Sequence, residues 1–421
     1  MSTATQQKNS QYFIELENEH GAHNYHPLPV VLDKGEGVYV WDVEGKRYFD
    51  FLSAYSAVNQ GHSHPKIVDA LIEQAQKLTL TSRAFYNSKL GEYEKKITKL
   101  FGFDKVLPMN SGAEAVETAL KIARKWSYEV KGIKGNSAKI IVCENNFHGR
   151  TTTIVSFSND PDAHNNYGPF TPGFTKIPYN DLAALETVLK EDAENIAAFL
   201  VEPIQGEAGV YVPDEGFLKG ASELCKKHNV LFIADEVQTG FGRTGKLFAM
   251  AHHESEVDII TYAKSLAGGM PLSGVVGRAE VMDAPAPGGL GGTYAGNALS
   301  IASAHAVLDI IEEENLCERA NQLGDRLKAM LTEIKPQIPH ISDVRGPGAM
   351  NAVEFTDPKT AQPDAEFTQK VRAAALKRGL LLLTCGTYGN VIRFLYPLTI
   401  QNEVFEEGLS ILKDALLEAV Q

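Results

Sequence analysis

Three short apolar runs in the middle of the chain predict strands of a buried sheet. They span residues 138–144, 196–203 and 230–237, and nearly continuous apolar side chains are typical of strands covered on both faces. Amphipathic stretches at residues 113–126 and 216–228 predict helices beside these strands. Strand alternating with helix indicates an α/β fold with a mainly parallel central sheet wrapped by helices. In such a sheet, ligands bind beyond the carboxyl ends of the strands.

The two ends of the chain follow a different pattern. Residues 37–51 form two partly alternating runs around Glu44 and Gly45, which predicts an antiparallel hairpin, and a helix is predicted from Pro65 onward. From about residue 320, helical stretches at 320–334 and 365–379 alternate with short strands at 348–355 and 391–398. We therefore expect three parts, which are an N-terminal segment (1–55) packing with the small domain, a large domain (56–320) and a small α+β domain (321–421).

Composition narrows the function classes. The 421 residues carry a net charge of −13 and contain no basic run, so we expect neither nucleic acid nor a membrane surface as a partner. The four cysteines lie far apart, which argues against a zinc ribbon or a disulfide scaffold. The polar start lacks the pattern of a targeting peptide, and no apolar stretch reaches the roughly 20 residues of a membrane span. These features predict a soluble, cytoplasmic protein that binds small molecules and a second copy of itself.

The stretch ITYAKSLAGGMP, residues 260–271, places Lys264 where an apolar run turns into a glycine-rich loop. A buried ammonium is costly, so this lysine either reaches solvent or serves as a nucleophile. Ser111 and Gly112 stand just before the helix at 113–126, where they form either a phosphate site or an ordinary helix cap. Nucleotide motifs of the P-loop and dinucleotide-binding types are absent from the sequence.

Asp235 and Glu236 follow the apolar run that begins at residue 230. A carboxylate at the end of a buried strand needs a partner, which is either the start of the next helix or the protonated nitrogen of a pyridine ring. A strand-end lysine, a strand-end aspartate and a Ser/Gly phosphate site together meet the requirements of pyridoxal phosphate. The combination is far more specific than any one of its parts.

The stretches LFIADEVQTGFGRTG (231–245) and ITYAKSLAGGMPLSGVVG (260–277) resemble the signature of the class III (ω-) aminotransferases. The resemblance covers nearly the whole chain and implies a fold-type I enzyme, with residues 56–320 binding pyridoxal phosphate and Lys264 as the Schiff-base lysine. It further implies that Asp235 pairs the ring nitrogen and that Gln238 bonds the ring hydroxyl. The remaining implied cofactor contacts are Phe147 stacking on the ring, Val237 beside it, Ser111, Gly112 and Ala113 at the phosphate, and Thr293 reaching the phosphate from the second subunit of a homodimer.

Within this group the resemblance divides at about residue 245. The part before it looks like ornithine aminotransferases, whereas the part after it looks closer to bacterial 4-aminobutyrate aminotransferases, so we expect a mosaic chain. The ornithine resemblance places Tyr25 and Tyr55 in the distal substrate pocket, although both could equally be ordinary half-buried aromatic residues. Arg150 is expected to bind the distal carboxylate, since a guanidinium matches a carboxylate bidentately.

The resemblance also assigns a pair of charged residues to the switch between substrates. Arg393 is expected to bind the α-carboxylate of 2-oxoglutarate, and Glu207 to cover Arg393 while ornithine reacts; the alternative is a static salt bridge. The sequence thus predicts an ornithine δ-aminotransferase, with 4-aminobutyrate aminotransferase and an inactive scaffold as alternatives. His62 and His64 have a spacing compatible with metal binding, but no ligand cluster accompanies them and we expect no metal.

Overall fold

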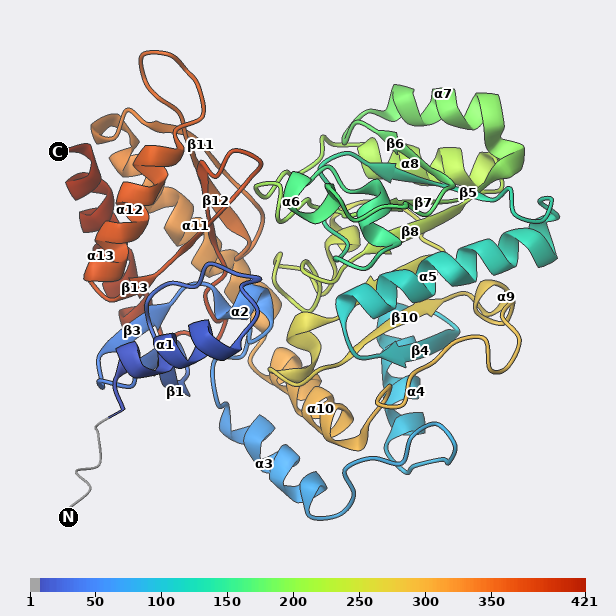
Figure 1. The fold of residues 1–421 in the computed structure, drawn as a ribbon, viewed down its shortest axis with the longest axis horizontal. Coiled ribbons are helices and arrows are strands. Elements are labelled where there is room, and N and C mark those ends of the chain that lie inside the picture. Colours follow the sequence, from blue (N-terminus) through green and yellow to red (C-terminus); the bar gives the residue numbers. More distant parts are fainter. Residues whose placement is uncertain (1–7) are drawn as a thin grey trace.

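The computed structural model describes residues 8–421, and Figure 1 shows the path of the chain. The described residues contain a central sheet of seven strands. Its strands, in spatial order, are β4 (Lys105–Met109), β10 (Ser273–Gly277), β9 (Ile259–Tyr262), β8 (Leu231–Asp235), β7 (Ile196–Val201), β5 (Lys139–Cys143) and β6 (Phe174–Ile177). The five strands from β9 to β6 are parallel, and β10 runs antiparallel to both of its neighbours. The predicted α/β class with a mainly parallel sheet is therefore confirmed.

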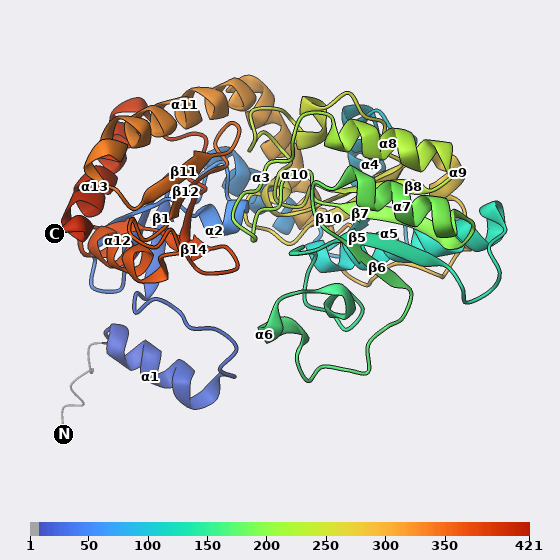
Figure 2. The ribbon, with the colours of Figure 1, turned by 90° about the horizontal axis from the view of Figure 1, so that it is seen from above.

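Helices cover both faces of this sheet. Alternate residues along a strand accordingly pack in two different apolar clusters, one on each face. Ile233 of β8 packs in the cluster of α5 (Gly112–Trp126), whereas its neighbours Phe232 and Ala234 pack in the cluster of α7 (Leu182–Asp192) and α8 (Phe217–Lys227). Figure 2 shows α5 on one side of the sheet and α7 and α8 on the other. Every residue of β7, β8 and β9 is buried, which explains the continuous apolar runs in the sequence.

A second sheet joins the two ends of the chain. Strands β1 (Leu32–Glu36), β2 (Tyr39–Asp42) and β3 (Arg47–Asp50) are antiparallel, and β3 pairs in parallel with β13 (Leu380–Leu381). The predicted hairpin is confirmed, and Gly45 in its turn has a φ of 84° that favours glycine. Strand β1, which precedes the hairpin, was not predicted.

The third sheet belongs to the C-terminal part of the chain. It consists of β11 (Ile341–Arg345), β12 (Asn351–Phe355), β15 (Val391–Phe394) and β14 (Leu383–Cys385), all antiparallel to their neighbours. Helices α11 (Leu316–Ile334) and α12 (Ala365–Lys377) lie against it, and α13 (Asn402–Val420) packs on these two helices and on β13 (Figure 2). The predicted boundary at residues 320/321 falls inside α11, so the division into three parts stays a prediction.

The remaining α-helices include the long, largely buried α10 and several shorter ones. They are α1 (Ser10–His20), α2 (Ser53–Ser56), α3 (Pro65–Ala75), α4 (Leu90–Phe101), α6 (Pro161–His164), α9 (Ala279–Met282) and α10 (Ala298–Glu313). Helix α3 begins at Pro65 as predicted, because proline is tolerated at the first helical position. Across residues 8–421, we find no helix with the length and apolar character needed to cross a membrane.

Candidate active site

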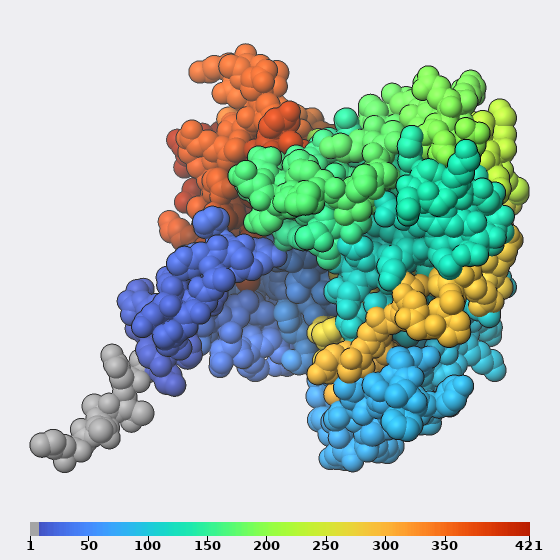
Figure 3. Space-filling view, turned by 45° about the vertical axis from the view of Figure 1, so that its right-hand side comes forward, coloured from blue at the N-terminus to red at the C-terminus, as the bar shows by residue number. Residues whose placement is uncertain are grey.

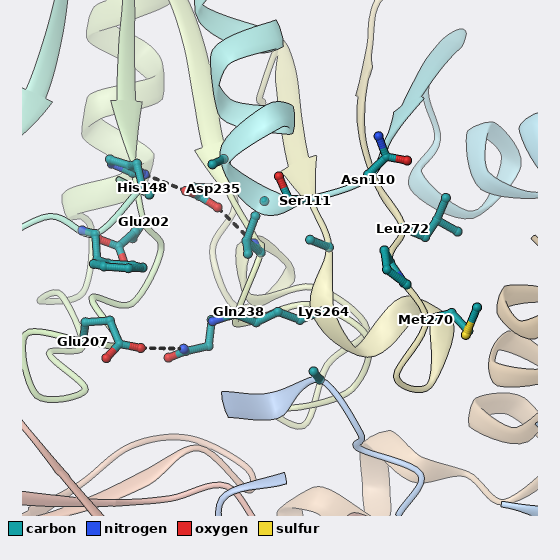
Figure 4. Close-up of a pocket in the computed structure, with 18 of the residues that line it drawn as sticks. Asn110, Ser111, His148, Glu202, Glu207, Asp235, Gln238, Lys264, Met270 and Leu272 are labelled. Atoms are coloured by element: carbon teal, nitrogen blue, oxygen red, sulfur yellow. Dashed lines mark hydrogen bonds and ion pairs between the residues drawn. The ribbon is translucent and has the colours of Figure 1, made fainter. Parts of the chain in front are cut away.

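A cavity of about 370 Å³ opens at the carboxyl ends of β7, β8 and β9 (Figure 4). This is the edge at which parallel sheets bind ligands, because the loops that follow the strands meet there. The sequence-predicted residues that line it are Ser111, Gly112, Ala113, Phe147, Glu207, Asp235, Val237, Gln238 and Lys264. Segments far apart in the sequence are therefore brought together at one place.

Lys264 begins a short 3-10 helix, Lys264–Ala267, directly after β9. Its φ is 49°, a left-handed conformation that costs an L-residue roughly 1–2 kcal/mol and marks a position held by its surroundings. Burial lowers the pKa of the Lys264 ammonium to about 8, so the neutral fraction of the amine near neutral pH is far larger than for an ordinary lysine. A neutral amine is the nucleophilic form, and this environment favours the nucleophile over the solvent-exposed alternative.

Asp235 is buried at the end of β8 and has two hydrogen-bond partners. Its Oδ2 lies 2.6 Å from His148 Nδ1, and its Oδ1 accepts the backbone N–H of Val237 at 3.0 Å. Burial opposes a charge on His148, but the hydrogen bond to Asp235 and the charges of Asp235 and Glu202 together outweigh it and raise the pKa of the imidazole. The Asp235 carboxylate is thus fixed in position by His148 and by the Val237 backbone, which suits a group that would hold a ring nitrogen. His148 was missed in the sequence, although it directly follows Phe147.

Glu202 is a second site residue that the sequence interpretation missed. It follows β7 as Asp235 ends β8, and its Oε2 accepts the backbone N–H of Phe147 at 3.0 Å. Burial raises the pKa of the Glu202 carboxyl to about 7. The signal that could have found it is the one used for Asp235, a carboxylate at the end of an apolar run.

The N-terminus of α5 forms another wall of the cavity. Ser111 caps the helix, since its Oγ accepts the Glu114 backbone N–H at 3.2 Å and the Glu114 carboxylate accepts the Ser111 N–H at 2.8 Å. The ordinary cap that the sequence allowed is therefore present. The backbone N–H groups of Gly112 and Ala113 belong to the first helical turn, whose donors have no intrahelical acceptor and favour an anion. A Cβ at Gly112 would lie 2.9 Å from Val237 Cγ1, so only glycine allows this close approach.

Glu207, Gln238 and Arg393 form a connected group on the side of the cavity away from α5. Arg393 Nη2 donates to Glu207 Oε1 at 2.9 Å, and Arg393 Nη1 donates to Gln238 Oε1 at 2.8 Å. Gln238 Nε2 in turn donates to Glu207 Oε1 at 3.1 Å. Burial opposes ionisation of Glu207, but the charges of Arg393 and Lys264 outweigh it and lower the pKa of that carboxyl to about 2. The structure thus holds the predicted pair in contact.

Tyr25, Tyr55 and Arg150 lie together near this group. Arg150 Nη1 donates to the Tyr25 hydroxyl at 3.1 Å, and the Arg150 guanidinium lies 5.2 Å from the centre of the Phe147 ring. Burial, and then the charge of Glu207, raise the pKa of the Tyr55 phenol, which places its hydroxyl within electrostatic range of that carboxylate. Both tyrosines remain partly exposed.

Three further residues that the sequence singled out lie apart from the cavity. Thr293 is exposed in the segment between α9 and α10 and does not line the cavity of this chain. His62 Nε2 lies 2.7 Å from Asp50 Oδ2, and His64 Nε2 lies 3.6 Å from Glu314 Oε1. Residues 8–421 contain no group of three His, Cys, Asp or Glu side chains placed to hold a metal ion.

Comparison with known proteins gives consistent relatives over the whole chain. An ornithine aminotransferase named as mitochondrial, from Drosophila ananassae, is 53% identical over 97% of this chain and 92% of its own. A solved structure of an acetylornithine aminotransferase from Elizabethkingia anophelis is 63% identical, with a TM-score of 0.88 over 98% of this chain and 100% of that chain. The Drosophila relative matches on both sides of residue 245, so the expected mosaic receives no support.

A third comparison bears on the cofactor. The ornithine aminotransferase of Toxoplasma gondii, 45% identical with a TM-score of 0.94 over 99% of this chain and 96% of that chain, is described with partial occupancy of pyridoxal phosphate at its active site. The cavity here has the donor set for that group. Lys264 offers an amine for the aldehyde, Asp235 a carboxylate for the ring nitrogen, and the N-terminus of α5 offers N–H groups for the phosphate.

The family assignment rests on almost the entire chain. A model of the family described as Aminotransferase class-III matches residues 20–416. The expected fold-type I architecture is confirmed by structural neighbours that superpose over nearly their full length. The chain therefore belongs to the class-III aminotransferases, enzymes that use pyridoxal phosphate.

Proposed function

We propose that this protein is an ornithine δ-aminotransferase, which transfers the terminal amino group of ornithine to 2-oxoglutarate and gives glutamate semialdehyde and glutamate. The observation that carries the proposal is the contact between Glu207 and Arg393 beside Tyr25, Tyr55 and Arg150. An enzyme that reacts with a terminal amine has to neutralise the arginine that would otherwise hold an α-carboxylate next to the cofactor. The many ornithine aminotransferases among the relatives support the same substrate.

Each residue of the cavity has a separate role in the proposed reaction. Bound pyridoxal phosphate supplies an aldehyde that bonds to the amine and a ring that accepts electrons from the substrate carbon. Lys264 Nζ would act as the general base that takes the proton from the δ-carbon of ornithine and afterwards as the general acid. Asp235, positioned by His148, would hold the nitrogen of the pyridine ring. Glu202 fixes the backbone of Phe147, which presents that ring to the cofactor face.

The distal end of ornithine needs both a carboxylate partner and an ammonium partner. Arg150 offers a bidentate donor for the α-carboxylate, and it is already oriented by its hydrogen bond with Tyr25. The Tyr55 hydroxyl can accept from the α-ammonium. In the second half-reaction Glu207 leaves Arg393, which then binds the α-carboxylate of 2-oxoglutarate. The two substrates thus use the same cavity in turn, as in ping-pong kinetics.

A second candidate donor is N-acetylornithine. It is favoured by the acetylornithine aminotransferase structure that is 63% identical to this chain. The two donors differ only at the α-amine, which is charged in ornithine and a neutral amide in N-acetylornithine. 4-Aminobutyrate, the alternative from the sequence, lacks the α-amine altogether, and the comparisons provide no specific observation in its favour.

The test follows the visible absorbance of bound pyridoxal phosphate while one donor at a time is added without 2-oxoglutarate. We expect ornithine to bleach the band fastest at equal concentration, with release of glutamate semialdehyde. If N-acetylornithine or 4-aminobutyrate bleaches the band faster, that compound would become the assigned donor in place of ornithine. Mass analysis of the product shows in each case which carbon lost its amino group.

We also propose a homodimer in which Thr293 completes the phosphate site of the partner. Phe85, Tyr86 and Tyr294 support it, since their side chains are 71%, 98% and 63% exposed. Apolar side chains gathered in this way are typical of an interface. Figure 3 shows the segments that contain these residues lying side by side on one face. Sedimentation should give a dimer, and Thr293→Ala should weaken cofactor binding without changing the sedimentation; a tightly loaded monomer would contradict the proposal.

The cytoplasmic location and the three-part division remain proposals as well. The cysteines at positions 143, 225, 317 and 385 are all unpaired, which suits a reducing compartment. Several relatives are named as mitochondrial, so cell fractionation has to distinguish the two locations. Limited proteolysis tests the division: because α11 is continuous across residue 320, resistance of that helix to cleavage would contradict a boundary at 320/321.

A further inference from the structure

Four consecutive residues with a left-handed backbone hold Tyr55 near Glu207 and Arg393. Ser53, Ala54, Tyr55 and Ser56 have φ values of 47°, 49°, 59° and 71°. None of them is glycine, and L-residues adopt such runs only when the surrounding structure enforces them. We call residues 53–56 the left-handed turn. Its geometry decides where the Tyr55 hydroxyl lies relative to Glu207.

Asp50 holds the beginning of this turn. Its Oδ1 accepts the backbone N–H groups of Leu52 at 2.8 Å and Ser53 at 3.0 Å. Its Oδ2 lies 2.7 Å from His62 Nε2. The entry to the turn is thus fixed by a buried carboxylate with both oxygens engaged.

Arg243 holds the end of the turn and is 0% exposed. Its Nε donates to Ser56 Oγ at 3.0 Å, and its Nη2 donates to Asn59 Oδ1. The hydrogen bonds that Arg243 makes within residues 8–421 all end on neutral oxygen atoms. A buried guanidinium without a carboxylate in contact is costly, so its retention points to a role that a neutral side chain would not fill.

The other side of the same guanidinium reaches the strand that carries Arg393. Arg243 Nη1 donates to the backbone carbonyl of Tyr396 at 2.9 Å and to that of Ala349 at 3.1 Å. Tyr396 lies just beyond β15, in which Arg393 is the third residue. Only the planar fork of arginine offers donors in enough directions to join these groups, which a single ammonium cannot reproduce.

We propose that Arg243 is a positioning residue for substrate selectivity, which clamps the left-handed turn to the end of β15 and so fixes Tyr55 relative to Arg393 and Glu207. The inference rests on the proposed ornithine activity, because it concerns the recognition of the distal end of that donor. Arg243 itself does not line the cavity and touches neither substrate nor cofactor. It acts through the backbone that it holds.

The test compares Arg243→Lys with the wild-type holoenzyme. The readout is the ratio of kcat/KM for ornithine to kcat/KM for 4-aminobutyrate, which lacks the α-amine. We expect the ratio to fall at least tenfold, chiefly through a higher KM for ornithine. The KM for 2-oxoglutarate should change less than threefold, because Arg393 is also anchored by the pairing of β15 with β12 and β14. Cofactor absorbance should be unchanged.

Arg319→Lys is the matched control. Arg319 also joins separate segments, by donating to the backbone carbonyl of Ile400 at 2.5 Å and to Asn402 Oδ1 at 2.8 Å, but it lies away from the cavity. The Arg319→Lys variant should have a lower melting temperature than the wild type but the same ratio of kcat/KM for ornithine to kcat/KM for 4-aminobutyrate. If Arg243→Lys does not fold, Ser56→Ala removes a single acceptor of Arg243 and should lower the ratio at least threefold.

The outcomes separate the two proposals. An unchanged ratio in a folded Arg243→Lys or Ser56→Ala enzyme, in a protein whose wild type uses ornithine, overturns the positioning role alone. An equal fall of the ratio in Arg319→Lys overturns it too, since the effect would then follow stability. A wild type that does not use ornithine overturns the proposed function and this inference with it.

Discussion

Replacement of Glu207 with glutamine tests the control of Arg393 most directly. The new amide side chain would keep the size of the original and could still accept a hydrogen bond from Arg393, but it would remove the charge that neutralises this buried guanidinium. Arg393 is then a free site for any α-carboxylate. We expect Glu207→Gln to favour 2-oxoglutarate and glutamate and to disfavour the productive orientation of ornithine.

The size of the effect follows from the charge interaction. The pKa of the Glu207 carboxyl falls from 4.5 to about 2 against the opposing effect of burial. Such a shift corresponds to about 3 kcal/mol in favour of the ionised carboxylate, or roughly a hundredfold in an equilibrium constant. Because glutamine retains part of the hydrogen bonding, we expect a smaller change, about 10-fold to 100-fold, in the KM for 2-oxoglutarate.

The assay measures each half-reaction separately in the stopped-flow spectrometer. With Glu207→Gln, glutamate should convert the cofactor at lower concentration than with the wild type. Ornithine should now lose its α-amino group in a measurable share of turnovers, because Arg393 holds its carboxylate next to the cofactor. An unchanged KM for 2-oxoglutarate together with release of glutamate semialdehyde alone would refute the switch and leave a static salt bridge.

Three other predictions concern the remaining parts of the site. Lys264→Ala should still bind pyridoxal phosphate noncovalently but lower kcat by at least about 100-fold, since the general base is lost; turnover at the wild-type rate would exclude this role. Tyr55→Ile should shift the donor ratio toward 4-aminobutyrate by about tenfold, the value of one hydrogen bond to a charged group, and an unchanged ratio would remove Tyr55 from the distal site. The rate at which the apoenzyme takes up pyridoxal phosphate should rise with pH and level off above the Lys264 pKa of about 8, because only the neutral amine attacks; a pH-independent rate would contradict this.

Residues at the ends of buried strands could be predicted because their surroundings are encoded locally. Asp235 and Lys264 each follow an apolar run, and a charge placed there requires a partner or a chemical use. Glu202 also follows an apolar run, so the same pattern could have identified it. The N-cap at Ser111 was likewise visible from its immediate neighbours.

Other parts of the site depend on segments that only the fold brings together. His148 pairs with a residue 87 positions away, and Arg243 with Ser56 at a separation of 187 positions. The left-handed turn could not be predicted from the sequence, because none of its residues is a glycine, the residue type that indicates a positive φ. The proposed role of Thr293 depends on a second subunit, which one chain does not contain. The expected mosaic receives no support from the relatives, because local likeness to two related groups does not require two origins.

In the proposed function, residues with unfavourable backbones would hold the two ends of the substrate. Lys264 at the cofactor end and residues 53–56 at the distal end make five non-glycine positions in the left-handed region. At roughly 1–2 kcal/mol each, their combined cost is comparable with the 5–15 kcal/mol net stability of an ordinary domain. Relief of this strain, for example by Ala54→Gly, should therefore stabilise the turn's backbone while letting Tyr55 move. Stability and alignment of the substrate are opposed at this turn, and the buried bonds of Asp50 and Arg243 are what keep the aligned form populated.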